Sequence, residues 1–279
     1  MHPFQWLFAV IRGRKGIHHV LLSIRLPLVL LAAMLYFAAG PTAKAASNDA
    51  KSVTVWIYHQ FPPFIIDAGS ETGLSFDLAG ALSRISDGRY DFTVEGVSRG
   101  RLNHRLAQGE KGIIFWVNPA WFKDAARVKY HWTQDLFLDS NDVISPIDRP
   151  VTYAGPASLS HMRLAGVQGH RYPDIEPLLQ AEQMTREDVA SEKHAVMFIA
   201  HGRADVSIVA SSAARHYANQ SDLAGRIHFS PRVFSSFTRS ILMQTDDAEL
   251  VDFVKDAIQN LMQRPEWHEM LSRYGLNED

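Results

Sequence analysis

The chain has 279 residues, of which 28 are basic and 30 are acidic, giving a formal net charge of −2 with histidine neutral. This length allows either one large domain or two lobes, and the charge lacks the positive excess typical of a nucleic-acid-binding protein. The sequence contains no cysteine, which excludes disulfide bonds and a lipid anchor attached to cysteine.

The first 45 residues are predicted to form an export signal. Four basic residues precede a short apolar core at Leu26–Ala39, no acidic residue occurs before Asp49, and Ala43-Lys44-Ala45 has the small-x-small pattern of a cleavage site. The core is shorter than the ~20 apolar residues that a spanning helix needs, which favours a signal peptide over a membrane anchor. We therefore expect cleavage near Ala45 and a soluble, monomeric protein in the periplasm.

The first structural unit is predicted in Val53–Leu82. An apolar run rich in β-branched and aromatic residues, Val53–Tyr58, predicts a buried strand. Phe61-Pro62-Pro63-Phe64 then interrupts regular structure, because neither proline has an N–H to donate. A turn at Gly69–Gly73 follows, and Ser75–Ala79 opens a helix.

Strands and helices alternate along the rest of the chain. The predicted strands are Asp91–Val97, Ile113–Val117, Leu164–Val167, Val206–Ala210 and Ser240–Gln244. The predicted helices are Arg99–Gln108, Ser191–His201, Ser211–Ala218, Asp247–Met262 and a last one opened by Pro265. Apolar strands separated by helices are typical of a parallel sheet covered on both faces, so we expect an α/β fold.

Three segments resemble the periplasmic solute-binding proteins of family 3, the polar-amino-acid-type binders of ABC importers. Gly73-Leu74-Ser75-Phe76-Asp77-Leu78-Ala79 is similar to the family's Gly-Phe-Asp-x-Asp-Leu-Ala. Gly202-Arg203-Ala204-Asp205-Val206 is similar to its Gly-Arg-x-Asp-Ala, and Leu164–Gly169 looks like the strand and ligand loop of its second lobe. The resemblance covers nearly all of the chain after the leader.

The resemblance implies a two-lobed periplasmic-binding-protein-like fold of type II, with a central cleft between two doubly wound lobes. The first lobe is expected at residues 52–137 and 237–279, and the second at residues 138–236. Two crossings, near Phe137–Val143 and Val233–Arg239, would act as hinges. A small-molecule solute is the expected ligand, and an inner-membrane ABC permease or a sensor protein is the expected partner.

Binding residues are expected where loops follow strands, because ligands of open α/β sheets lie beyond the carboxyl ends of the strands. Four such loops give the candidates Tyr58 and Phe61, Trp116 and Asn118, His170 and Arg171, and Ser211. A place in the core is the alternative for Phe61 and Trp116, and a solvated place is the alternative for Arg171. Arg171 follows Gly169, where the family exposes backbone N–H groups that favour an anion.

The sequence departs from the family where amino-acid binders hold the α-amino and α-carboxylate groups. The family's arginine, in a Thr-x-x-Arg turn, aligns with Ala126, and a slip of one residue makes Arg127 the candidate for the carboxylate. Its aspartate, five residues beyond the Gly-Arg-x-Asp aspartate, aligns with Ala210. We therefore expect no paired amino-acid clamp, and an aromatic or anionic solute as a better ligand than a common α-amino acid.

The leading interpretation is a non-enzymatic solute-binding protein that serves an ABC importer. No enzyme motif, metal-binding spacing or cofactor fingerprint occurs in the sequence, so no metal and no cofactor are expected. The alternatives are a dehydratase-like enzyme on the same fold, a ligand-sensing protein, and a degenerate scaffold that binds no ligand. The enzyme would need a general acid, for which His59, His170 and Glu95 are available.

Overall fold

The computed structural model describes residues 50–276, which belong to one compact unit. The predicted export signal and its cleavage near Ala45 lie outside the described residues. Within residues 50–276, every helix is too short or too polar to cross a membrane.

The first lobe is built on three parallel strands with their helices. β1 pairs with β2 on one side and with β3 on the other, and β10 then adds an antiparallel strand next to β3. The strands are β1 (Lys51–Ile57), β2 (Tyr90–Gly96), β3 (Gly112–Val117), the short β4 (His131–Trp132) and β10 (Ser235–Gln244). The helices are α2 (Leu74–Ile85), α3 (Arg99–Ala107), α7 (Ala248–Leu261) and α8 (Pro265–Arg273).

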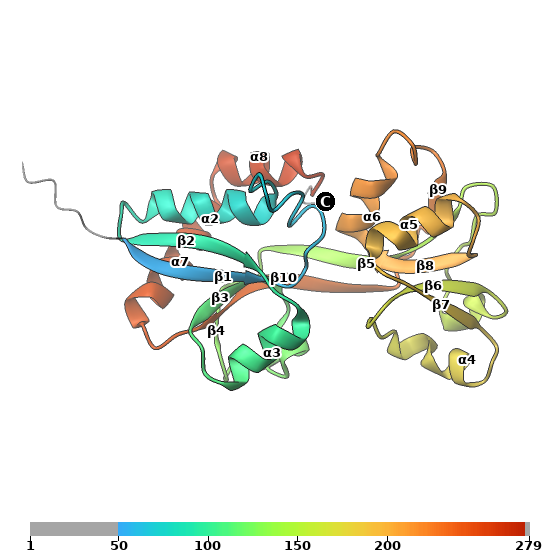
Figure 1. Cartoon of the computed structure of the whole chain (residues 1–279), viewed down its shortest axis with the longest axis horizontal. Coiled ribbons are helices and arrows are strands. Elements are labelled where there is room, and N and C mark those ends of the chain that lie inside the picture. Colours follow the sequence, from blue (N-terminus) through green and yellow to red (C-terminus); the bar gives the residue numbers. More distant parts are fainter. Residues whose placement is uncertain (1–49, 277–279) are drawn as a thin grey trace, which may run out of the picture. The chain divides into compact units, whose positions relative to one another are not determined.

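This sheet is covered on both faces because its strands are apolar on both faces. Val55 and Ile57 belong to a core cluster shared with α2, α7 and α8, whereas Trp56, between them, belongs to a cluster shared with α3. Figure 1 shows α2 and α3 on opposite faces of the sheet. The near-continuous apolar runs of the sequence thus produce a helix–sheet–helix sandwich.

The second lobe repeats this arrangement. β6 pairs in parallel with β7 and β8, and β5 pairs with β8 in antiparallel orientation. The strands are β5 (Phe137–Pro146), β6 (Arg163–Val167), β7 (Thr185–Val189), β8 (Val206–Ala210) and β9 (Ile227–Phe229). The helices of this lobe are α4 (Glu176–Gln180), α5 (Glu192–Ala200) and α6 (Ser211–Ala218). Short 3-10 helices occur in the described chain at Pro119–Phe122, Pro156–Leu159 and Pro173–Ile175.

Two long strands carry the chain between the lobes. β5 and β10 pair with each other in antiparallel register, from Ser235 opposite Asn141 to Arg239 opposite Phe137. Beyond this shared stretch β10 pairs with β3, while β5 pairs with β8. The sheet is therefore continuous through its hydrogen bonds, although each lobe has its own core clusters. The exact residues at which the lobes divide stay predictions.

Several strands differ from the sequence-based expectation. β5 was expected as an extended crossing and is a ten-residue strand, and β10 begins at Ser235 rather than Ser240. β7 and β9 were not predicted at all. β7 is mostly exposed, with only Val189 buried, so it lacks the apolar pattern of a strand.

Candidate functional site

A cavity of about 1150 Å³ lies among the loops at the carboxyl ends of strands from both lobes. This is the place that the topology predicts for a ligand. The first lobe supplies Tyr58, His59, Gln60, Phe61, Ser98, Arg99 and Trp121. The second supplies Val167, Gln168, Gly169, His170, Arg171, Tyr172, Pro173, Asp174, Ala190, Ser191, Glu192 and Ala210, and the connecting strands with their approaches supply Asn141, Phe234, Ser235, Phe237 and Arg239.

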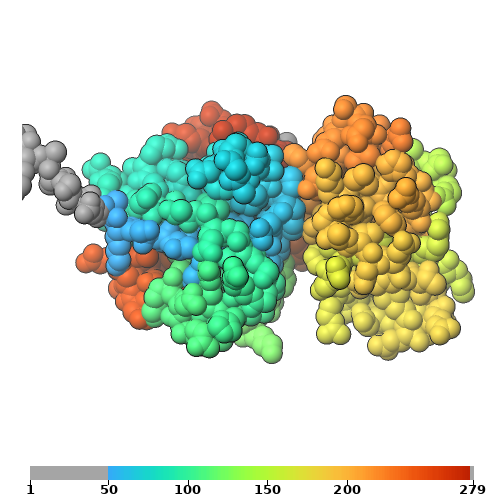
Figure 2. Space-filling view, viewed as in Figure 1, coloured from blue at the N-terminus to red at the C-terminus, as the bar shows by residue number. Residues whose placement is uncertain are grey.

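The loop after β1 gives the cavity an aromatic wall. The ring of His59 lies 3.9 Å from that of Tyr58, 5.4 Å from that of Phe61 and 5.6 Å from that of Trp121, between centroids. Phe61 also packs against the main core cluster of each lobe. The exposed residues that follow, 66–72, lie on the surface drawn in Figure 2, in blue to cyan.

Burial shifts the pKa of two groups on this wall. Desolvation, opposed only in part by nearby Arg99, raises the pKa of Tyr58 to about 12. Desolvation also holds the pKa of His59 well below its usual range, and positive charge on Arg239, His170 and Arg99 adds to this effect. His59 is thus a neutral imidazole, and its buried Nε2 has no hydrogen-bond partner among residues 50–276.

Arg99 places a cation beside these rings. It is the first residue of α3, after Ser98, whose side chain caps the helix by accepting from the Arg101 N–H. Its guanidinium donates to the carbonyl of Trp121 at 2.6 Å and lies 4.9 Å from the centre of the Tyr58 ring. A fixed guanidinium above an aromatic face can receive an anionic or a π-rich group.

The loop after β6 forms part of the opposite wall. Gly169 adopts φ +80, a conformation that suits glycine, and His170 and Arg171 follow it. Arg171 is exposed, and its side chain makes no hydrogen bond or ion pair with another described residue. It is therefore available to a ligand. Tyr172 is fixed behind it, because its hydroxyl donates to the carbonyl of Ile208 at 3.1 Å.

Four charged residues of the cavity lining were not predicted from the sequence, namely Arg99, Asp174, Glu192 and Arg239. Arg239 on β10 is 1% exposed and forms an ion pair with Asp139 on β5, with Nη2 2.6 Å from Oδ2. Glu192, the first residue of α5, is 5% exposed, and its Oε1 has no hydrogen-bond partner in the described part of the chain. The cavity therefore contains a buried carboxylate as well as arginines.

Four of the eight predicted site residues line the cavity, namely Tyr58, Phe61, His170 and Arg171. The other four, Trp116, Asn118, Arg127 and Ser211, are not among its lining residues. Ala210, predicted to leave the usual ammonium position uncharged, does line the cavity.

Trp116 and Ser211 are held by structural contacts instead. Trp116 is fully buried, stacks on Phe64 with centroids 5.4 Å apart, and donates from Nε1 to Ser75 Oγ at 2.8 Å. Trp116 thus lies in the core, which was the alternative to a place in the binding site. Ser211 donates to Asp142 Oδ2 at 2.8 Å, which ties the start of α6 to β5.

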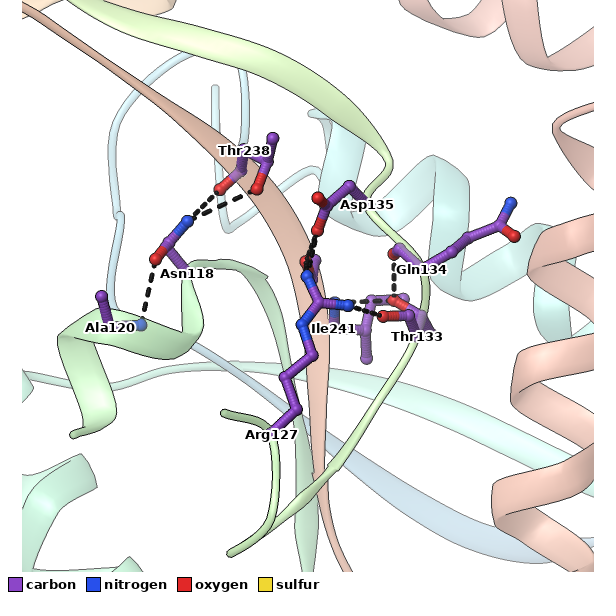
Figure 3. A network of polar contacts seen from close by, with 9 residues as sticks. Asn118, Ala120, Arg127, Thr133, Gln134, Asp135, Thr238 and Ile241 are labelled. Atoms are coloured by element: carbon purple, nitrogen blue, oxygen red, sulfur yellow. Dashed lines mark hydrogen bonds and ion pairs between the residues drawn. The ribbon is translucent and has the colours of Figure 1, made fainter. Parts of the chain in front are cut away.

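Asn118 and Arg127 belong to a polar network of the first lobe, shown in Figure 3. Asn118 donates from Nδ2 to the carbonyl of Thr238 at 2.9 Å and accepts from the Ala120 N–H at 3.0 Å. Arg127 donates from Nη1 to the carbonyl of Thr133 at 2.9 Å and pairs with Asp135. The geometry gives no support to the prediction that Arg127 holds a carboxylate in the cleft, because Arg127 is not among the lining residues of the cavity and pairs with Asp135 instead.

Within residues 50–276, no cluster of three or more histidine, aspartate or glutamate side chains is arranged to hold a metal ion.

No protein-family model and no curated protein matches the sequence. Solved structures match the fold. A mutant of the arginine-binding protein of T. maritima has a TM-score of 0.62 and 18% identity, covering 80% of this chain and 94% of that chain. An ancestral amino-acid-binding protein, described as a precursor of cyclohexadienyl dehydratase, has a TM-score of 0.58 and 16% identity, covering 80% and 94%. The periplasmic domain of B. pertussis BvgS has a TM-score of 0.61 and 22% identity, covering 81% and 43%.

At these identities the likeness concerns the fold alone. The chain has the two-lobed α/β fold of periplasmic amino-acid-binding proteins, which confirms the fold class predicted from the sequence.

Proposed function

We propose that the protein is a periplasmic solute-binding protein of the family-3 kind, which captures a small solute between its two lobes and presents it to an inner-membrane ABC permease. The observation that carries this proposal is the cavity of about 1150 Å³ lined by loops of both lobes. Its volume lies just above the range of ~300–1,000 Å³ that is typical of ligand sites. A solute that contacts both walls would favour their closure about β5 and β10.

The side chains of the cavity suit binding. Rings of Tyr58, Phe61 and Trp121 offer apolar faces, and Arg171 is a cation without a partner among the described residues. Such a mixture is typical of sites where aromatic contact supplies affinity and a few charges fix orientation. An aromatic or anionic group on the solute is therefore accommodated. Amino acids are also candidates, since solved structures of this fold include an arginine-binding protein.

A thermal-shift screen of the purified mature protein against small solutes tests the proposal. A solute that binds the folded state raises the apparent stability by ~2.7 kcal/mol at 100 times its dissociation constant. Calorimetry on the hits should give a stoichiometry of one, and Arg226→Ala, an exposed arginine outside the cavity lining, serves as a control for non-specific charge effects. If no solute in a broad library shifts the melting temperature, solute capture is wrong.

The importer role has a separate test. Cells in which the gene is deleted should lose uptake of a radiolabelled solute identified in the screen, and the gene restored on a plasmid should recover it. Undiminished uptake in the deleted strain would favour the sensor alternative.

A second candidate is an enzyme on the same fold, which His59 favours. Its imidazole is neutral, lies in the cavity wall, and has a buried Nε2 to which no described residue is hydrogen-bonded. A neutral imidazole does not fit the general acid expected from the sequence, but it can accept a proton from a bound molecule as a general base. Incubation of the protein with cyclic carboxylic acids, followed by mass spectrometry, would reveal loss of water. Product that forms with the wild type and not with His59→Asn would favour this candidate.

A further inference from the structure

The most unusual group of the cavity is the carboxylate of Glu192. It lies in the cavity wall and is 5% exposed, and within residues 50–276 its Oε1 has no hydrogen-bond partner. The ring of His170 approaches this oxygen, but its Nε2 lies 3.6 Å from Oε1, too far for a good hydrogen bond. A buried carboxylate oxygen that loses water without gaining a donor is costly to the folded protein.

We infer that Glu192 is the cation-binding residue of the cleft and accepts a hydrogen bond from an N–H-donating cationic group of the solute, a primary ammonium or a guanidinium. This inference rests on the proposed function. A bound cation supplies both the missing donor and the missing counter-charge, so the cost of burying Oε1 is offset when the solute is bound.

The described side chains near Glu192 do not donate a hydrogen bond to its Oε1, so a solute can supply the donor. Ser191 uses its side chain to cap α5, and the nearby Tyr172 hydroxyl donates to the Ile208 carbonyl. His170 is 46% exposed at its side chain, so it can move aside as a solute enters. Among the described residues, Oε1 is left without a donor.

The position of Glu192 also explains how a charged solute is held without an acid at the end of β8. Ala210, the residue at that strand end, lines the same cavity and is uncharged. Glu192 is the first residue of the helix that follows β7. The acidic group therefore enters the cavity from the end of β7 rather than from the end of β8. Arg99 and Arg171 also line the cavity and can receive an anionic group of the same solute. The ligand class is therefore a solute with an N–H cation and a second, anionic or π-rich group.

The requirement for a hydrogen-bond donor distinguishes this inference from simple charge attraction. A quaternary ammonium carries the same charge as a primary ammonium but has no N–H. It would leave Oε1 unpaired.

The experiment uses the mature wild-type protein and sets of three matched solutes: a primary amine that binds, its N-trimethyl derivative, and its deaminated counterpart. Isothermal titration calorimetry should give dissociation constants at least tenfold higher for the second and third members. Glu192→Gln keeps the size of the side chain and removes its charge. It should weaken the amine at least tenfold and leave the deaminated solute within twofold.

Glu187→Gln is the matched control, because Glu187 is an exposed glutamate on β7 of the same lobe and does not line the cavity. It should leave all three dissociation constants within twofold.

The results that overturn the inference differ from those that overturn the proposed function. A deaminated solute that binds wild type as tightly as its amine, or an amine unaffected by Glu192→Gln, shows that the cleft binds solutes without using Glu192 as a cation site. Absence of binding by every solute, with a folded wild type, overturns solute capture and this inference together. The comparison of the three solutes on wild type decides the inference even if Glu192→Gln does not fold.

Discussion

Arg239 on β10 and Asp139 on β5 form an ion pair that is almost completely shielded from water. The Asp139 Oδ2 atom lies 2.6 Å from Nη2 and 2.7 Å from Nε of Arg239, with the side chains 3% and 1% exposed. Arg239 also donates from Nη1 to the carbonyl of Trp116 on β3, and Ser212 of α6 donates to Asp139. The pair thus links the two connecting strands to one element of each lobe.

Asp139→Asn is expected to lower the free energy of unfolding by ~3–5 kcal/mol, because the guanidinium of Arg239 stays buried without a counter-charge. Urea denaturation followed by circular dichroism measures the change. Asp246→Asn is the control, since Asp246 pairs with Lys111 at the surface, where the side chains are 86% and 53% exposed. That variant should lose less than ~1 kcal/mol. Equal losses in the two variants would contradict a special role for the buried pair.

Ser75→Ala is expected to cost ~1–3 kcal/mol of stability, because it leaves the buried Nε1–H of Trp116 without an acceptor. Binding of a solute should be unchanged, since Trp116 does not line the cavity. Ser70→Ala, at an exposed position of the loop before α2, should change stability by less than ~0.5 kcal/mol. If the Ser75→Ala protein has normal stability but binds its solute more weakly, the result would indicate that Trp116 takes part in solute binding.

The fold could be predicted where strands are apolar on both faces. β3 is a continuous apolar run, β1 and β8 are predominantly apolar, and β8 and α6 have the predicted bounds. β5 could not be recognised in the same way, because Asp139-Ser140-Asn141-Asp142 reads as a loop. Asp139 and Asp142 are nonetheless buried, since Arg239 and Ser211 from distant parts of the chain supply their partners. Local sequence does not contain that information.

The same limit of local sequence explains which lining residues of the cavity were among the predicted candidates and which were not. Tyr58, Phe61, His170 and Arg171 follow predicted strands and line the cavity. Glu192 was missed because β7 was missed, so the start of α5 was not recognised as a strand-end loop. An Asp or Glu that opens a helix is ordinarily solvated, and only the packing around Glu192 buries it.

His59 should make the protein less stable as the pH falls. Its pKa is held well below its usual range in the folded state, while the unfolded chain has the ordinary value of about 6.5. Below that pH the unfolded state binds a proton that the folded state rejects, so this contribution to stability is present above pH ~6.5 and is lost as the pH falls, by at most ~1.4 kcal/mol per unit.

His59→Asn should therefore flatten the dependence of the unfolding free energy on pH between about 6.5 and 5. Denaturation curves at a series of pH values measure both slopes. Identical slopes for wild type and variant would show that His59 takes up a proton in the folded protein.

Arg171→Ala is expected to weaken an anionic solute by ~1.5–3 kcal/mol, the range for a hydrogen bond to a charged group. The reason is that Arg171 lines the cavity, follows the turn at Gly169, and has no partner among the described residues. Folding should be unaffected because the side chain is exposed. Calorimetry at low and high salt should show a larger effect at low salt, since an exposed charge is screened, while Arg226→Ala should leave affinity unchanged at both. Micromolar binding of an ordinary α-amino acid that is indifferent to Arg171→Ala would mean that its carboxylate is held elsewhere. Arg99 is then the remaining cavity arginine that pairs with no carboxylate among the described residues, since Arg239 is already paired with Asp139.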